Sequence, residues 1–217
     1  MEDNINIREQ FIELNKLYPG LQLMENSESY CIEGDITINA EYNNAWIIDD
    51  YSIQIHVPFN FPQRIPSVYE TSHKIPRGYR HFLDNGALCL GVTAEIYRLL
   101  YQNSTLIFFV NTFVINYLYS VSYFVKYGIM PFGERAHGSQ GIYEYYKDFF
   151  KVKTDGQALA VLMFVALGNY RGHIDCPCGS GEKIRKCIHK DIIFNAINSE
   201  FHSCYQADCL ELMKRRR

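Results

Sequence analysis

The chain has 217 residues, of which 47% are hydrophobic, 15% aromatic and 21% charged. This composition supplies enough apolar surface for a packed core and excludes a chain that is disordered throughout. Lys and Arg total 21 against 24 Asp and Glu, and the net charge of −3 argues against a protein built mainly to coat nucleic acid or anionic lipid.

The N-terminal part predicts a helix followed by an antiparallel sheet. Residues 5–17 carry apolar side chains at helical spacing. Residues 21–57 then alternate apolar and polar side chains over several segments, with turn residues at Gly34 and at Asn43-Asn44. This pattern predicts an antiparallel meander with one buried face.

Two unusual stretches come next. Residues 58–66 hold three prolines, so they should form an extended segment that crosses the sheet edge instead of a central strand. Residues 99–125 contain no charged side chain and are long enough to span a bilayer. However, polar Asn, Ser and Gln residues fall inside this stretch and no basic cluster flanks it, which favours a long helix buried against the sheet.

The C-terminal part predicts helices and then a small separate unit. A Gly-rich loop at 128–141 precedes two segments with helical spacing, 142–150 and 157–167. The expected domains are 1–168, which includes these helices as an extension, and 169–217, a Cys-rich unit with a basic tail.

The cysteines indicate a reducing compartment. Their number, seven, is odd, and three of them lie within twelve residues. That pattern is typical of metal or thiol chemistry in the cytosol and not of a disulfide framework. The acidic first residues are not followed by an apolar run and do not resemble a signal peptide. We therefore expect a cytoplasmic protein.

Four potential metal ligands lie close together in the sequence: Cys176, Cys178, Cys187 and His189. Two thiolates one residue apart, a Gly-Ser-Gly turn, and then a Cys and a His can close a tetrahedral site for Zn²⁺. A closed set of four ligands would make this zinc structural and not catalytic. The pattern resembles the SEC-C zinc motif, but here one residue separates Cys187 from His189. That departure leaves His173 as an alternative fourth ligand.

A second candidate site centres on Cys89. This residue follows the turn sequence Asp84-Asn85-Gly86 and stands in a Leu-Cys-Leu string. A thiol in that place can form a thioester, which suits a protein that carries an acyl group and then gives it to an amine. On the Leu-Cys-Leu string alone, a buried apolar cysteine is the favoured interpretation.

The wider pattern resembles the ubiquitin-conjugating enzyme (UBC) family over about residues 5–130. The prolines at 58, 62 and 66 have the spacing of that family's proline segment, and the string from Asn85 to Leu90 matches its active-cysteine segment in residue type. The resemblance implies a UBC-like α+β fold, with an N-terminal helix, a four-stranded meander, an active-site loop and a long buried helix, here followed by extra helices and a small zinc knuckle. It also implies that Cys89 is the thioester-forming nucleophile.

His81 is the second candidate catalytic residue. In the UBC family the Asn of a His-Pro-Asn tripeptide helps to stabilise the oxyanion formed when a lysine attacks, and the equivalent positions here are Tyr79, Arg80 and His81. An imidazole can donate a hydrogen bond to an oxyanion in place of the amide, and it can also accept a proton, which an Asn cannot. Packing of the turn is the alternative role for His81.

The segment from Phe124 to Tyr146 resembles prokaryotic UBC-like proteins, which stand beside cGAS-like nucleotidyltransferases in the antiphage systems called CBASS. The sequence contains neither a dinucleotide-binding nor a P-loop fingerprint, so the chain is not expected to activate its own substrate. The resemblance implies a transferase of the short class, without a fused activating domain, in antiviral defence. The expected acyl donor is the C-terminus of the partner nucleotidyltransferase.

Two other functions stay open. A UBC-like scaffold could bind the same partner without chemistry, because the tripeptide is altered. A zinc-dependent nucleic-acid adaptor could use Lys183, Arg185, Lys186 and the basic tail at 214–217. These basic residues are few, and a basic tail is more typical of a solvated chain end than of a nucleic-acid contact. We therefore expect a protein partner, no nucleic acid and no membrane, with homodimers and hetero-oligomers both open.

Overall fold

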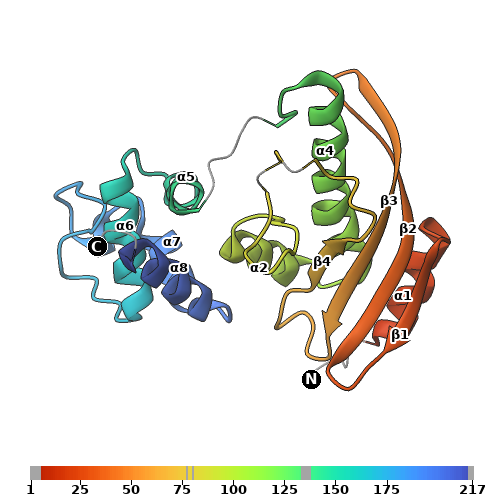
Figure 1. Ribbon diagram of the computed structural model, residues 1–217. Coiled ribbons are helices and arrows are strands. Elements are labelled where there is room, and N and C mark those ends of the chain that lie inside the picture. Colours follow the sequence, from red (N-terminus) through yellow and green to blue (C-terminus); the bar gives the residue numbers. More distant parts are fainter. Residues whose placement is uncertain (1–5, 77, 80, 133–137, 215–217) are drawn as a thin grey trace. The chain divides into compact units, whose positions relative to one another are not determined.

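The computed structural model describes residues 6–76, 78–79, 81–132 and 138–214. The chain is a mixed α+β protein, as the sequence predicts (Figure 1). It divides into two compact units. Unit 1 comprises Met1–Gly91 and Leu99–Glu134, and unit 2 comprises Val92–Arg98 and Arg135–Arg217.

A four-stranded antiparallel sheet forms the centre of unit 1, and its strand order β1-β2-β3-β4 follows the chain. The meander predicted from the alternating pattern is therefore confirmed. Its buried face is apolar because alternate side chains of a strand point to the same side, and Ile32 on β2 lies opposite Ile55 on β3 with both fully buried. The strands are β1 Leu21–Glu25, β2 Ser29–Tyr42, β3 Ala45–Pro58 and β4 Ser67–Glu70.

The turn expected at Gly34 is wrong, because β2 runs through this residue without a break. Gly34 has φ +136°, and a Cβ atom placed there would lie 2.1 Å from the carbonyl oxygen of Gly20. This glycine therefore allows the chain to approach closely within a strand. The first turn instead follows Asn26, whose side chain accepts hydrogen bonds from the next residues. The turn predicted at Asn43-Asn44 is confirmed, with φ of 50° and 61°.

Helix α1, Ile7–Leu17, precedes the sheet in the chain, and the proline segment lies between strands β3 and β4. The helix begins at Asn6, whose side chain caps it by accepting from the backbone N–H groups of the first turn, and it buries Ile7 and Leu14. The proline segment after β3 is not a central strand, as expected, but it folds into turns and is not simply extended. The Phe61 N–H donates to the Pro58 carbonyl at 2.9 Å at its start.

The uncharged stretch at 99–125 is not one helix. Its first residues end helix α2, Thr93–Gln102, and Thr105 then caps a new helix that runs from residue 106 to 127. This long helix consists of α3 Leu106–Phe109, the π-helical η1 Val110–Ile115 and α4 Asn116–Tyr127. Within the described part of the chain it alone is long and apolar enough to cross a membrane by length and composition, and 61% of its apolar 18-residue window is buried.

The long helix packs on the sheet, as predicted. The Tyr51 hydroxyl of β3 lies 2.7 Å from the Ser122 hydroxyl of α4, and the Tyr119 hydroxyl donates to the carbonyl of Ala45. Ser122, one of the polar residues that argued against a membrane span, thus helps to join helix and sheet. Phe109, Phe113 and Leu118 of this helix are buried, and Phe108 is partly buried.

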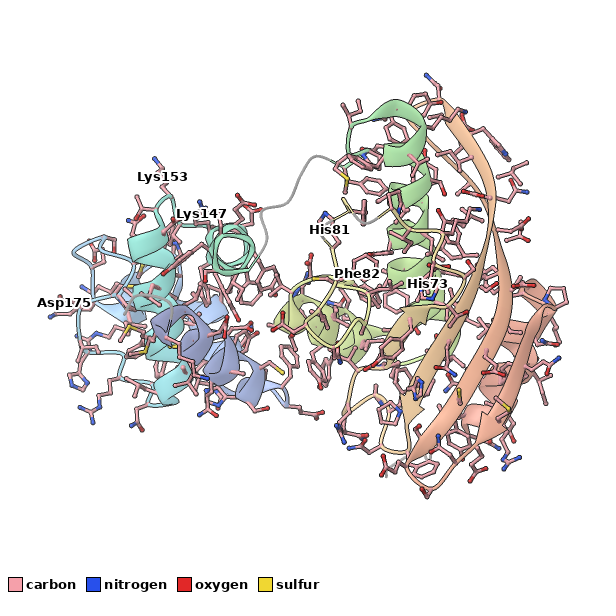
Figure 2. All side chains as sticks on the ribbon, in the orientation of Figure 1. His73, His81, Phe82, Lys147, Lys153 and Asp175 are labelled. Carbon is pink, nitrogen blue, oxygen red and sulfur yellow. The ribbon has the colours of Figure 1, made fainter. Side chains whose placement is uncertain are left out.

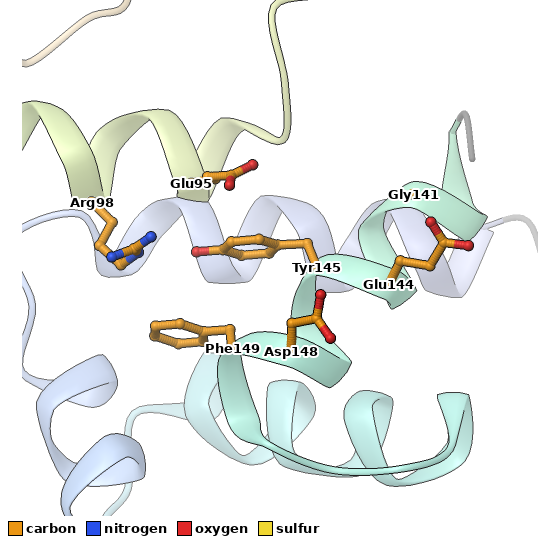
Figure 3. A pocket seen from close by; sticks show the side chains of 7 residues that line it. All are labelled: Glu95, Arg98, Gly141, Glu144, Tyr145, Asp148 and Phe149. Carbon is orange, nitrogen blue, oxygen red and sulfur yellow. The ribbon is translucent and has the colours of Figure 1, made fainter. Parts of the chain in front are cut away.

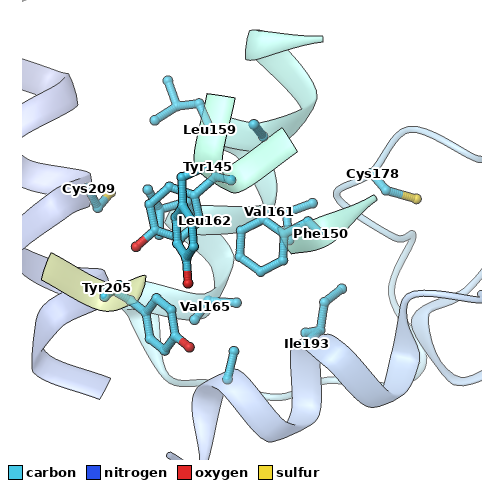
Figure 4. Close-up of a cluster of buried hydrophobic side chains, with 14 of the residues drawn as sticks. Tyr145, Phe150, Leu159, Val161, Leu162, Val165, Cys178, Ile193, Tyr205 and Cys209 are labelled. Carbon is cyan, nitrogen blue, oxygen red and sulfur yellow. The ribbon is translucent and has the colours of Figure 1, made fainter. Parts of the chain in front are cut away.

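Unit 2 is built from helices around its own core (Figure 4). The two predicted helices are confirmed as α5, Ser139–Phe150, and α6, Asp155–Leu167, so the last residues of the predicted loop already belong to α5. They share one buried cluster with Ala94 of α2 and with the cysteine segment. The predicted boundary between 168 and 169 falls inside this unit. The remaining elements are η2 Ile184–Lys186, α7 Lys190–Ile197 and α8 His202–Lys214.

Candidate functional site: a cysteine loop and a metal centre

A tight turn precedes Cys89. Phe82 and Leu88 form an isolated antiparallel bridge, and the Gly86 N–H donates to the carbonyl of Leu83 at 2.9 Å. Asn85 serves this turn, as expected, because its side chain accepts from the N–H of Ala87. Gly86 has φ +83°, a conformation that L-residues with side chains seldom adopt. The turn therefore fixes the direction in which the chain enters Cys89.

Two backbone hydrogen bonds then hold Cys89 in place. The Leu88 N–H donates to the carbonyl of Val68 on β4 at 2.7 Å, and the Cys89 N–H donates to the carbonyl of His81 at 2.9 Å. Cys89 is also the one cysteine of the seven that is not buried. Burial still raises the pKa of its thiol, while the backbone of Gly91 acts in the opposite direction. The side chain is thus anchored, partly exposed and mostly protonated at neutral pH.

His81 is joined to Cys89 through the backbone. Its carbonyl accepts a second hydrogen bond, at 2.7 Å, from the hydroxyl of Tyr117 on α4. Its ring lies against Tyr79, with centroids 5.0 Å apart. The catalytic role of the imidazole stays a prediction, and Arg80, between these two residues, lies outside the described residues. Figure 2 labels His81 and the neighbouring Phe82 on this loop.

Sequence reasoning missed the aromatic surroundings of this loop. Tyr79 packs edge-on against Tyr117, and burial raises the pKa of both hydroxyls, with the charge of a Cys89 thiolate adding to the effect. On the outer side of the turn Phe82 and Leu83 are 38% and 51% exposed. The contacts of Tyr79 with Tyr117 and Phe124 join distant parts of the sequence, so no local spacing could have indicated them.

The second predicted site lies in a loop of unit 2. The Cys176 N–H donates to the carbonyl of Glu182, and Asp175 and Lys183 form an isolated antiparallel bridge, so the chain folds back on itself. Gly179 and Gly181 both have positive φ in the connecting turn, which is where the sequence placed its Gly-Ser-Gly. This fold brings the two ends of the cysteine motif together.

The four predicted ligands form one cluster. The Sγ atoms of Cys176, Cys178 and Cys187 and a ring nitrogen of His189 all lie within 4.8 Å of one another, and all four residues are buried. His189 is therefore the histidine of the cluster, while His173, the alternative, is exposed and lies outside it. The Nε2 of His189 is 3.4 Å from the carbonyl of Lys151, a contact that would leave Nδ1 free to bind an ion.

The distances fit a tetrahedral ion. Ligands at Zn–S distances of about 2.3 Å are about 3.8 Å apart at the corners of a tetrahedron. The Cys178 and Cys187 sulfurs are 3.6 Å apart, and the Cys187 sulfur is 3.3 Å from Nδ1 of His189. With four protein ligands such a site has no open position, so the cluster is compatible with a structural metal.

The thiols of the cluster have unequal pKa values. Burial raises the pKa of Cys176 to about 12. Burial also acts to raise the pKa of Cys187, but hydrogen bonds from the His189 backbone, the Ser180 hydroxyl and the His189 ring outweigh it and lower this pKa to about 6. A bound divalent cation would replace the protons, because cysteine binds metals as the thiolate.

Comparisons of the chain with known protein families, with curated proteins and with solved structures gave no match in any of the three. The resemblances to the UBC family and to the SEC-C motif therefore stay predictions that rest on the residues quoted for them.

Proposed function

We propose that the protein is a UBC-like carrier that forms a thioester between Cys89 and the C-terminus of a partner protein. The observation that carries this proposal is the placement of Cys89, which is the one cysteine left partly exposed and is held at its backbone by His81 and, through Leu88, by β4. A buried structural cysteine has no need of such anchoring, whereas a nucleophile must be held in one place.

The reaction needs a donor that is already activated. The Cys89 thiolate attacks the carbonyl carbon of an acyl adenylate or thioester supplied by a separate activating enzyme, a C–S bond forms, and the adenylate or thiol leaves. A primary amine then attacks the thioester carbonyl, the C–S bond breaks, and the amine gives up a proton as the amide forms. His81 would stabilise the oxyanion of this second step or take its proton.

The proposed partner is a cGAS-like nucleotidyltransferase of an antiphage system, as the sequence resemblance implies. The exposed Phe82 and Leu83 beside the cysteine support a protein partner, because large apolar side chains at an active-site rim are typical of protein contact surfaces. We further propose that the metal of the cluster is Zn²⁺ held as in a SEC-C motif, since the ligand set of three thiolates and one imidazole is typical of structural zinc.

The test is intact mass under non-reducing conditions after co-expression with the candidate donor and an activating enzyme. The wild type should carry a donor adduct that thiol or hydroxylamine removes, Cys89→Ser should carry a more stable oxyester, and Cys89→Ala should carry none. Cys31→Ala, the same change at a buried cysteine of the same unit, should behave as the wild type. An adduct that survives in Cys89→Ala would defeat the proposal.

His81 is tested at the transfer step. His81→Ala should still form the thioester but pass it on about 10²-fold more slowly, the usual cost of losing one oxyanion donor. His81→Asn should recover part of the rate if the role is oxyanion binding, and none if it is proton transfer. Equal transfer rates in the wild type and in His81→Ala would show that His81 has no part in the transfer and only packs the turn.

One observation favours the non-catalytic scaffold as a second candidate. Burial raises the pKa of the Cys89 thiol, so little of it is thiolate at neutral pH. A scaffold would bind the same partner with equal affinity in the wild type and in Cys89→Ala, and it would never carry the adduct. The mass experiment therefore separates the two functions.

A further inference from the structure

Unit 2 contains a pocket of about 400 Å³ that neither candidate site uses (Figure 3). Helix α2 contributes Glu95 and Arg98, and helix α5 forms the rest of the wall. The size lies near the lower end of the range for small-molecule sites, about 300–1,000 Å³, so the pocket suits a small ligand. The α5 residues of the wall are Gly141, Glu144, Tyr145, Asp148 and Phe149.

Two polar atoms of this wall have no hydrogen-bond partner among the described residues. They are Nε of Arg98 and the hydroxyl oxygen of Tyr145, and both are shielded from solvent. Tyr145 as a whole is only 9% exposed, and Figure 3 shows its hydroxyl directed toward Arg98. A buried polar group without a partner is destabilising, so a ligand that supplies the partner is favoured.

The missing partner is an acceptor. Arg98 has only donors, and the hydroxyl of Tyr145 has a proton of its own to donate. The guanidinium is close enough to act on the hydroxyl: burial raises the pKa of Tyr145 to about 12, and Arg98 works against that rise. Two converging donors of this kind, one of them charged, are suited to a carboxylate.

A plain anion would nevertheless be disfavoured by the rest of the wall. Among the described residues, the carboxylates of Glu95, Glu144 and Asp148 line the same pocket as the guanidinium of Arg98. A carboxylate ligand therefore has to bring a positive charge of its own to be accepted. A plain cation would suit the acidic wall but would leave the Arg98 and Tyr145 donors without an acceptor.

The pocket also offers an aromatic surface. The rings of Tyr145 and Phe149 lie almost parallel, 9° apart in orientation with centroids 5.7 Å apart, and Phe149 is partly exposed. A further ring can pack against such a pair, which favours a ligand with an aromatic side chain.

We propose that this pocket binds a free α-amino acid with an aromatic side chain, whose carboxylate accepts from Arg98 and Tyr145 and whose ammonium group faces the carboxylates of Glu144 and Asp148. The ring of the ligand packs against Phe149. All the lining residues belong to one compact unit, none of them belongs to the cysteine loop or the metal cluster, and the proposal does not depend on the proposed transferase activity.

The test is calorimetric titration of the full-length protein with three probes that share a ring and a side chain of the same length. L-Phenylalanine carries both charges, 3-phenylpropionate lacks the ammonium group and 2-phenylethylamine lacks the carboxylate. L-Phenylalanine should bind at least 10-fold more tightly than either of the other two, because each of them loses one charge-assisted contact.

Tyr145→Phe is the sharpest variant, because it removes one hydroxyl that has no partner in the described structure. It should weaken L-phenylalanine binding about 10-fold and leave the stability of the free protein unchanged or slightly higher. Tyr143→Phe is the matched control, since Tyr143 lies on the same helix, is equally buried and does not line the pocket. It should bind as the wild type does.

Three outcomes would overturn the proposal. The first is no binding of L-phenylalanine at millimolar concentration. The second is equal binding of L-phenylalanine and 2-phenylethylamine, which would make the pocket a cation site without a carboxylate contact. The third is unchanged affinity for L-phenylalanine in Tyr145→Phe.

Discussion

The carbonyl of His81 is the residue-scale feature on which the cysteine loop depends. It accepts one hydrogen bond from the backbone of Cys89 and one from the side chain of Tyr117. The first bond is local, whereas the second ties the loop to a helix 36 positions further along the chain. The long helix therefore helps to hold the loop that carries Cys89, and it does so through the side chain of Tyr117.

Tyr117→Phe should reveal this dependence. The change removes only the hydroxyl, so the ring packing against Tyr79 stays, and the free energy of unfolding should fall by about 1 kcal/mol. Thioester formation at Cys89 should slow as the loop loses its tether, measured as the initial rate of adduct formation. Tyr127→Phe, on the same helix but 44% exposed, should alter neither quantity. Unchanged rates in Tyr117→Phe would show that the tether is not used.

The sequence indicated the candidate residues of both sites but not the residues that support them. Cys89 and the four members of the metal cluster stand out because their chemistry depends on residue type and short spacing. Tyr117 and the Arg98–Tyr145 pair act across long sequence separations, where one sequence alone carries no spacing rule. The same limit explains why His189 could be chosen over His173 only once the loop was folded.

At the scale of elements, β2 depends on a single glycine. Gly34 sits within the strand at φ +136°, directly beside the carbonyl of Gly20. The sequence suggested a turn here because glycine favours turns. Nothing in the local sequence indicates that Gly20, 14 residues earlier in the chain, lies so close to Gly34 in space. Alternation of side chains and the Asn43-Asn44 turn, by contrast, are local signals, and both were read correctly.

Gly34→Ala should therefore be strongly destabilising. The added Cβ would lie 2.1 Å from a backbone oxygen, so strands β1 and β2 must separate or the backbone must leave its conformation. We expect a loss of about 2–4 kcal/mol in the free energy of unfolding, measured by urea denaturation. Gly78→Ala is the control, because a Cβ there meets no atom within 4 Å, and it should change stability by less than about 0.5 kcal/mol.

Helices α5 and α8 are joined by a buried carboxyl group. Tyr146 donates to Asp208 at 2.7 Å, and burial raises the pKa of Asp208 to about 6 although this hydrogen bond lowers it. The folded state thus keeps a proton that the unfolded chain, with an ordinary Asp pKa near 3.9, gives up at lower pH. This group stabilises the fold below about pH 4, and its contribution is lost as the pH rises to about 6.

Asp208→Asn removes the charge and keeps an oxygen that can accept from Tyr146. The variant should be more stable than the wild type at pH 7, by about 2 kcal/mol, because the wild type must hold an ionised carboxylate in a buried place. The advantage should vanish near pH 4, where both side chains are neutral. Urea denaturation at pH 4, 5, 6 and 7 measures this difference, and a gap that does not depend on pH would contradict the assignment.

At the scale of the whole molecule, the metal cluster belongs to the core of unit 2. Cys176, Cys178 and Cys187 lie in the same buried cluster as the helices α5, α6 and α8. The metal unit predicted from the sequence, residues 169–217, includes α8 but not α5 and α6, because the apolar face of a helix identifies a core but not which segment fills it.

Removal of the metal should accordingly loosen more than the cysteine loop. Cys176→Ser should release about one zinc ion per chain, measured by elemental analysis, and should open α5, α6 and α8 to limited proteolysis. The sheet of unit 1 has its own core and should stay resistant. The control is Cys204→Ser, which changes a buried cysteine outside the metal cluster. This variant should keep its metal. Absence of zinc from the wild-type protein would contradict this prediction.

Helix α2 is divided between the two compact units. Residues 92–98 are counted with unit 2, although the segments on both sides of them belong to unit 1. Ala94 is fully buried in the second core, so the contiguous piece 135–217 lacks part of its own interior. Gene fusion and gene loss act on contiguous stretches of sequence. A single event that moved only residues 135–217 would therefore leave part of the second core behind.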